Sequence, residues 1–177
     1  MILRHTSEIR LSKHSSIIFS SKLGNILISE NNKKINIVTL TKLKIKPARS
    51  SNLNRAKKEI LEYLSSRRKK FGFKVFPEGT VFQKIVWKKL QNIKYGNICT
   101  YSDIATSINS SPRAVGRACA FNKCLFLIPC HRVVASNGEL RGFSAIGGLL
   151  SKKKLLFVEK VIPNTRGKYK PIKAKLR

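Results

Sequence analysis

The alternation of apolar and polar residues divides the chain into a strand-forming first part and a helical second part. Residues 16–40 contain three short β-prone apolar runs, separated by turn-forming clusters at residues 22–25 and 30–34. This pattern predicts an antiparallel meander. Residues 53–70 then place apolar side chains at helical spacing, at Leu53, Ala56, Ile60, Leu61 and Leu64. One amphipathic helix is therefore expected after the strands.

The signals for helices become sharper beyond residues 71–79, a break that predicts a linker. Thr80 and Gln83 match a capping box, in which each side chain bonds to the backbone N–H of the other residue. The helix that follows is expected to bury one apolar face and to end at Gly96. That face comprises Phe82, Ile85, Val86, Leu90 and Ile93.

Two shorter helices are predicted next, separated by a turn at residues 109–111. The first runs from about residue 102 to 108, and the second begins with Ser111 as N-cap and Pro112 as its first residue. Such a helix-turn-helix occurs in DNA-binding proteins and in many other globular proteins. Gly116 lies inside the second helix, where glycine costs about 1 kcal/mol relative to alanine. It indicates close approach of another backbone, that of a nucleic acid or of a neighbouring helix.

The charge balance points to a polyanionic partner. The chain carries 37 basic and 8 acidic residues, a net charge of +29. Such a charge attracts phosphate polymers, so nucleic acid is the expected partner, although a lysine-rich composition can also reflect codon usage or a solvated surface. Apolar runs such as residues 125–128 are far shorter than the roughly 20 residues of a membrane span. The N-terminus has a basic, serine-bearing character but no apolar signal core, so we expect a cytoplasmic protein without membrane association.

Four cysteines fall close together in the second part of the chain: Cys99, Cys119, Cys124 and Cys130. They form no CxxC pair, and no histidine stands at zinc-ligand spacing, so a metal site is not expected. Without a secretory signal the thiols are expected to stay reduced. They are interpreted as core residues with at most one reactive thiol among them.

The segment Leu125–Val134 is the best candidate for chemistry. An apolar strand is expected to fail at Pro129, which cannot donate to a sheet ladder, and so to present Cys130 at a bend. The thiolate is the reactive form of cysteine, and His131 and Arg132 bring a proton acceptor and a positive charge close in sequence. Adjacent strand residues point to opposite faces, so direct contact between Cys130 and His131 requires an irregular backbone. A single water could instead relay the proton between them.

A carboxylate would hold the histidine in one tautomer, and three acids follow Ser102 in the sequence: Asp103, Glu139 and Glu159. Glu159 ends an apolar helix and is the best candidate. The alternative for Cys130 is a packed core thiol with no chemical role.

Several blocks of sequence, taken together, resemble the O6-alkylguanine-DNA alkyltransferase family. The order and spacing of the blocks agree from residue 79 to residue 159, whereas the first sixty residues match loosely. The blocks are GTVFQKIVW (79–87), TYSDIA (100–105), RAVGRA (113–118), Asn122, IPCHRVV (128–134) and KKKLLFVE (152–159).

The resemblance implies an α+β fold with two domains. An N-terminal ribonuclease H-like antiparallel sheet domain would span residues 1–72. A mainly helical domain with the helix-turn-helix and the Pro-Cys-His-Arg segment would span residues 73–160. Independently of the resemblance, residues 161–177 are basic and contain no acidic residue, so they are expected to form a mobile C-terminal tail that adds nonspecific affinity for DNA.

The resemblance also implies catalytic roles for particular residues. Cys130 would accept the alkyl group, His131 would act as a water-linked base, and Glu159 would orient it. Tyr101 would lie beside the flipped base, and Asn122 would join the helix-turn-helix to the wall of the active site.

Further residues would contact the DNA or the base. Arg113 would enter the duplex and fill the space left by the extruded nucleotide. The other DNA contacts implied are Ala114, Gly116, Arg117 and Arg132. The backbone around Val133 and Ser144 would bond to the guanine edge, and Phe143 would line the same pocket.

The activity implied is direct repair of DNA: a single, irreversible transfer of an alkyl group from O6-alkylguanine to Cys130. O4-alkylthymine is a second candidate substrate, and no metal or organic cofactor is needed. The partner would be double-stranded DNA bound through its minor groove by a monomer. Four departures from the family pattern put the size of the pocket and its alkyl-group preference in doubt: Lys123, a shorter turn before Arg113, Phe143 and a longer 143–148 loop.

Two other classes of function compete with this one. A protein that recognises alkylated guanine without repairing it would lack the acceptor cysteine. A basic structural or RNA-binding protein would explain the charge but not the combination of Cys130, Arg113, Asn122 and Glu159.

Overall fold

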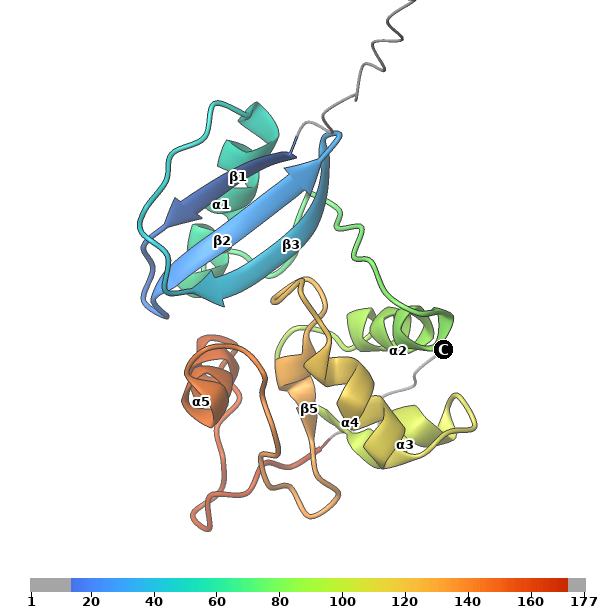
Figure 1. Cartoon of the computed structure of the whole chain (residues 1–177). Coiled ribbons are helices and arrows are strands. Elements are labelled where there is room, and N and C mark those ends of the chain that lie inside the picture. The colour runs from blue at the N-terminus through green and yellow to red at the C-terminus, as the bar shows by residue number, and fades with distance from the viewer. Residues whose placement is uncertain (1–13, 172–177) are drawn as a thin grey trace, which may run out of the picture.

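A computed structural model describes residues 14–171 and shows a small sheet with its own helix beside a helical part (Figure 1). The strands β1 (His14–Phe19), β2 (Asn25–Asn31) and β3 (Lys34–Thr41) form an antiparallel sheet in the order β1-β2-β3. The expected meander is confirmed. Alternate residues of β2, such as Ile26 and Ile28, are buried, as period-two packing requires.

One helix, α1 (Ser51–Leu64), packs against the sheet through contacts with β1 and β2. Ser50 caps it by accepting a hydrogen bond from the Leu53 N–H. The helix ends at Leu64 rather than near residue 70, because Ser66 takes a left-handed conformation (φ +59°) and stops the helical ladder. Tyr63, absent from the expected apolar face, is fully buried.

The second part begins with α2 (Val81–Gln91), whose predicted capping box between Thr80 and Gln83 is confirmed. The predicted buried face was partly wrong: Phe82 is 36% exposed and Ile85 is 45% exposed. The helix is rotated so that Trp87 is buried, with its indole N–H donating to the carbonyl of Ala118 (2.9 Å). Trp87 is the largest side chain of α2, and the hydrogen bond of its indole N–H allows it to be buried. This explains which face of α2 packs against the core.

The helix-turn-helix consists of α3 (Tyr101–Thr106) and α4 (Pro112–Ala120). Ser111 caps α4 and Pro112 is its first residue, as predicted. Two elements were not anticipated. Strand β4 (Cys99–Thr100) pairs in parallel with β5 (Val133–Val134), and this pairing ties the start of α3 to the segment that follows Cys130.

The chain closes with η1 (Cys130–Arg132), a single 3₁₀ turn, and with α5 (Gly148–Val158). The two parts are joined by backbone hydrogen bonds, since Val38 of β3 donates to Lys123 and accepts from Leu125 (both 2.8 Å). The expected α+β class is confirmed. The domain boundary after residue 72 stays a prediction.

Residues 161–171 differ from the expected mobile tail. Tyr169 is 4% exposed, packs with Ile98, Val134 and Leu156, and donates its N–H to Gly138 (2.9 Å). This segment therefore belongs to the packed body of the protein. The rest of the predicted tail, residues 172–177, and the basic N-terminal residues 1–13 lie outside the described residues. Between residues 14 and 171, no helix is long and apolar enough to cross a membrane.

Candidate active site

The backbone that presents Cys130 is irregular, as predicted, but it differs in detail. Residues 125–128 form turns instead of the expected apolar strand, with Phe126 at φ +71°. Pro129 then leads into the η1 turn. A 3₁₀ turn frees adjacent side chains from strict strand alternation. Cys130 lines a cavity, whereas His131 contacts Glu159 in the protein core.

Asn122, which follows the C-cap residue of α4, holds the thiol in place. Its amide nitrogen donates to the Cys130 sulfur (3.3 Å) and to the carbonyl of Ile128 (2.7 Å), and its oxygen accepts from the Cys124 N–H (2.9 Å). The position fits the joining role implied by the family resemblance.

The thiol itself is 5% exposed. Burial raises the pKa of Cys130, against the hydrogen bond from Asn122, the charge of Lys152 and two backbone N–H groups, which lower it. Cys130 is therefore a thiol at rest, and its reaction requires a base.

His131 is suited to that role. Its Nε2 atom lies 3.0 Å from Oε1 of Glu159, and both side chains are buried. A carboxylate only accepts, so Nε2 carries the hydrogen and Nδ1 keeps a free lone pair. Burial lowers the pKa of His131 below its usual value, against the raising effect of Glu159. The imidazole is thus neutral near pH 7 and able to take a proton.

Glu159 stays ionised although it is 2% exposed. Burial alone would raise its pKa, but hydrogen bonds and charge from His131 and Arg132 hold the pKa well below the usual range. Further donors are the Tyr63 hydroxyl (2.6 Å) and the Gly96 N–H (3.0 Å). Glu159 is the C-cap residue of α5, and its carboxylate accepts hydrogen bonds from three other segments: α1, the loop at Gly96 and the η1 turn. It therefore ties the site to the rest of the fold.

Arg132 was expected to contact DNA, and the structure contradicts this. It is 7% exposed, and its guanidinium binds Glu159 through Nη2 (2.7 Å) and Nε (2.9 Å) and donates to the carbonyl of Ile93. All of these partners are internal. The residue stabilises the carboxylate behind His131, because it is directed away from the surface by the turn at residues 130–132.

Lys152 is a member of the site that sequence reasoning missed. It is fully buried, and its ammonium group donates to the carbonyl of Arg141 (2.8 Å) and to the Tyr101 hydroxyl (3.4 Å). Burial lowers its pKa to about 8, while Cys130 and Cys119 oppose the shift. A signal was available: Lys152 shares one helical face with Leu155, Leu156 and Glu159.

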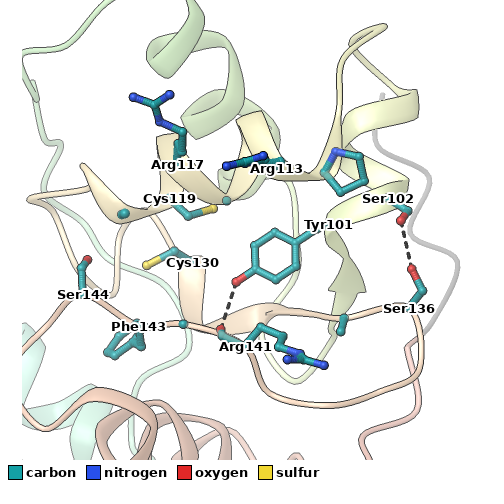
Figure 2. A pocket seen from close by; sticks show the side chains of 15 residues that line it. Tyr101, Ser102, Arg113, Arg117, Cys119, Cys130, Ser136, Arg141, Phe143 and Ser144 are labelled. Carbon is teal, nitrogen blue, oxygen red and sulfur yellow. Dashed lines mark hydrogen bonds between the residues drawn. The ribbon is translucent and has the colours of Figure 1, made fainter.

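A cavity of about 750 Å³ opens in front of the thiol (Figure 2). Cys130, Tyr101, Phe143 and Ser144 line it, as expected for the pocket residues. Val133 is buried in β5 and does not line it, so its predicted main-chain contact with a base stays a prediction. Tyr101 donates to the carbonyl of Arg141 (3.2 Å), which fixes the phenol across the cavity.

Helix α4 forms one side of the same cavity through Arg113, Gly116 and Arg117 (Figure 2). A Cβ atom on Gly116 would meet only a ring carbon of Tyr101 from α3, at an ordinary contact distance of 4.0 Å, so close approach of a neighbouring helix does not explain this glycine. The face stays open on the cavity side. Ala114 is half-buried and does not line the cavity.

Other groups bear on the choice of chemistry. All four cysteines are free, and Cys119 lines the cavity beside Cys130, although burial raises its pKa strongly. In the described part of the chain, no cluster of histidine, cysteine or acidic side chains could hold a metal ion. The fold and the cavity therefore define a protein with a helix-turn-helix beside a cavity, in whose wall a thiol lies next in sequence to a carboxylate-bound histidine.

Comparison with known proteins agrees with this class. The family model for the 6-O-methylguanine DNA methyltransferase DNA-binding domain matches residues 81–161. A methylated-DNA–protein-cysteine methyltransferase of Methanosarcina acetivorans is 36% identical over 151 residues, 80% of this chain and 96% of that protein. The inducible enzyme of the same name from Bacillus subtilis is 46% identical over 104 residues, 58% of this chain and 57% of that protein.

Solved structures are similar over most of the chain. An O6-methylguanine methyltransferase of Mycobacterium tuberculosis has a TM-score of 0.73 at 28% identity, covering 83% of this chain and 93% of that one. The OGT protein of the same organism in complex with DNA has a TM-score of 0.72 at 28% identity, covering 82% and 92%. The chain belongs to the methylated-DNA–protein-cysteine methyltransferase family.

Proposed function

We propose that this protein repairs DNA directly by moving an alkyl group from the O6 atom of guanine to the sulfur of Cys130. Family membership supplies the reaction class. The observation that supports the residue assignment is the position of Cys130 at the cavity wall, bonded to Asn122 and followed by the neutral, carboxylate-bound His131.

The reaction balances without a cofactor. His131 takes the proton of Cys130 through its free Nδ1 atom, directly or through one water, and the thiolate attacks the alkyl carbon. The carbon–oxygen bond breaks and its electron pair stays on O6. The proton that His131 took from the thiol is passed on to the leaving guanine, so that the imidazole ends the reaction neutral. The product is a thioether, which nothing in this site hydrolyses, so each molecule reacts once.

The buried groups around the thiol contribute stabilisation rather than new bonds. The hydrogen bond from Asn122 and the charge of Lys152 favour the thiolate, and the ionised Glu159 favours the protonated His131. The phenol of Tyr101 lines the cavity, and we assign it a hydrogen bond donated to the departing base in place of its bond to the Arg141 carbonyl. These contributions share one direction: each stabilises the charges that appear as the proton leaves sulfur.

Access for the base requires that the nucleotide leaves the duplex, because O6 is not reachable in the stack. We assign this step to α4, whose Arg113 and Arg117 lie at the cavity and whose Gly116 leaves room for a close backbone. We further propose that α4 binds the minor groove, with Ala114 also facing the DNA, and that a monomer acts. O6-alkylguanine is the proposed lesion, with O4-alkylthymine as a second candidate.

The test is intact-protein mass spectrometry after incubation with duplex DNA containing O6-methylguanine. One added methyl group per molecule, mapped to Cys130, is expected. Cys130→Ser should bind the duplex with unchanged affinity and gain no mass, because the substitution removes the nucleophile and leaves α4 intact. Cys124→Ser, at another buried free cysteine outside the cavity, is the matched control and should still accept the group. Transfer by Cys130→Ser, or continuous turnover, contradicts the assignment.

A further inference from the structure

Tyr63 brings the sheet-bearing N-terminal part of the chain into the chemical site. It lies on α1 and is 0% exposed. Its hydroxyl donates to Oε1 of Glu159 over 2.6 Å and lies 3.4 Å from Nε2 of His131. A residue of the first part of the chain thus touches both members of the base assembly.

The phenol is held by packing on several sides. Its ring centroid lies 5.3 Å from that of Phe71, 5.8 Å from Phe126 and 6.0 Å from Tyr95. Such contacts restrict the ring and fix the direction of the hydroxyl. The donor therefore reaches Glu159 in one geometry.

The contact is placed where it influences His131. Oε1 of Glu159 accepts from Tyr63, from His131 (3.0 Å) and from Arg132 (2.7 Å), and the Tyr63 bond is the shortest of the three. Donors that share one carboxylate oxygen compete for its negative charge. The hydrogen bond that Tyr63 donates therefore makes Oε1 of Glu159 a weaker acceptor for the imidazole N–H of His131.

We propose that Tyr63 is a positioning residue for alkyl transfer, which fixes the Glu159 carboxylate and tunes how readily His131 takes the proton of Cys130. This assignment rests on the proposed function. Nothing in the reaction requires the phenol to touch the substrate, because it lies behind Glu159 and does not line the cavity.

The sign of the effect follows from the two distances. The 2.6 Å bond to Glu159 withdraws charge from the carboxylate and lowers the proton affinity of His131, whereas the 3.4 Å contact with His131 is too long to compensate. Removing the hydroxyl should make Glu159 a stronger acceptor. The pKa of His131 should rise, so that more of it is already protonated below neutral pH and unable to act as a base.

Other ionisable groups near His131 and Glu159 do not obscure the acid limb of the pH profile, the range in which protonation of His131 slows the reaction. Those facing His131 and Glu159 are Cys130, Arg132, Lys152, Tyr63 and Tyr95. Burial raises the pKa values of the thiol and of both phenols, and Lys152 titrates on the alkaline side, with a pKa of about 8. A change in the acid limb therefore reports on His131.

The experiment compares Tyr63→Phe with Tyr95→Phe in the full-length protein. Tyr95 is a matched control, because its hydroxyl donates to the carbonyl of Val158 (2.7 Å) and not to the carboxylate. Two rates are measured from pH 5 to 9: transfer from O6-benzylguanine, and iodoacetamide alkylation of Cys130 followed by peptide mass mapping. Urea unfolding of each variant is recorded in parallel.

For Tyr63→Phe we expect the acid limb to move upward by roughly one pH unit, so that both rates fall about tenfold at pH values on that limb and stay within about twofold of the wild type at pH 8. Tyr95→Phe should stay within about twofold of the wild type, with the limb unmoved. Wild-type rates in Tyr63→Phe, an equal loss in both variants with unmoved limbs, or failure of Tyr63→Phe alone to fold would each overturn the proposal. Absence of transfer by the wild type would refute the proposed function instead, and the iodoacetamide profile would still test Tyr63.

Discussion

Glu159→Gln separates the structural and chemical roles of the buried carboxylate. The substitution preserves shape and removes the charge that pairs with Arg132 and His131. Arg132 is 7% exposed, so its guanidinium would be left buried without an anion. Removing one partner of such a pair costs about 3–5 kcal/mol, a large part of the total stability of a protein of this size. We expect a loss of that order in the free energy of unfolding.

The second step removes the orphaned charge as well. The double variant Glu159→Gln with Arg132→Met has no buried ion, and replacing both partners of a pair with neutral groups is often close to neutral. The double variant should therefore be more stable than the single one by at least about 1 kcal/mol. Its thiol should stay as unreactive as that of Glu159→Gln, because His131 lacks its carboxylate in both.

Urea unfolding at several pH values and iodoacetamide alkylation of Cys130 measure the two effects. Because folding depresses the pKa of Glu159, its contribution is present above the unfolded pKa of about 4.3 and is lost as the pH falls toward the folded value. The gap between wild type and Glu159→Gln should thus narrow below pH 4. A cost under about 1 kcal/mol at pH 7, or a double variant less stable than the single one, would refute this account.

Two further substitutions test the cavity. Lys152→Met should be at least as stable as the wild type at pH 7. Folding lowers the pKa of Lys152 from 10.5 to about 8, so burying the charged lysine destabilises the folded state by about 3 kcal/mol at pH 7. This penalty disappears as the pH rises toward 10.5. The substitution should also slow alkylation of Cys130, and faster alkylation together with lower stability would contradict both expectations. Arg113→Ala should slow repair of duplex DNA by on the order of tenfold more than transfer from free O6-benzylguanine, since a free base has no stack to leave. Equal losses on the two substrates would assign Arg113 to the fold.

Local signals predicted most of the fold. The capping box at Thr80, the N-cap at Ser111 and the turn clusters of the sheet act within a few residues, so their outcome is readable from the chain. The rotation of α2 could not be predicted from the sequence, because it depends on the hydrogen bond from Trp87 to the carbonyl of Ala118 in another helix. The parallel pairing of β4 and β5 is too short to leave a period in the sequence.

The same distinction holds for the active site. Cys130, His131 and Glu159 were found because their residue types, and their spacing in a known family pattern, are visible in the sequence. Arg132 was predicted to contact DNA because the sequence does not show in which direction a basic side chain beside a cysteine points. The η1 turn directs this side chain inward, to Glu159. Tyr63 was missed for a different reason: nothing in α1 shows that its phenol meets the end of α5.

The electrostatic state of the thiol connects these observations. Burial keeps Cys130 protonated at rest, and a thiol is a poor nucleophile compared with a thiolate. A protein that is consumed by one alkyl group would be wasted by any small electrophile, so a nucleophile that depends on a buried base is suited to single use. The base in turn depends on Glu159, which is held from the N-terminal part by Tyr63 and from the active-site turn by Arg132. The reactivity of Cys130 is therefore a property of the packed whole chain, and separating residues 1–72 from the rest should remove it even where the helix-turn-helix stays folded.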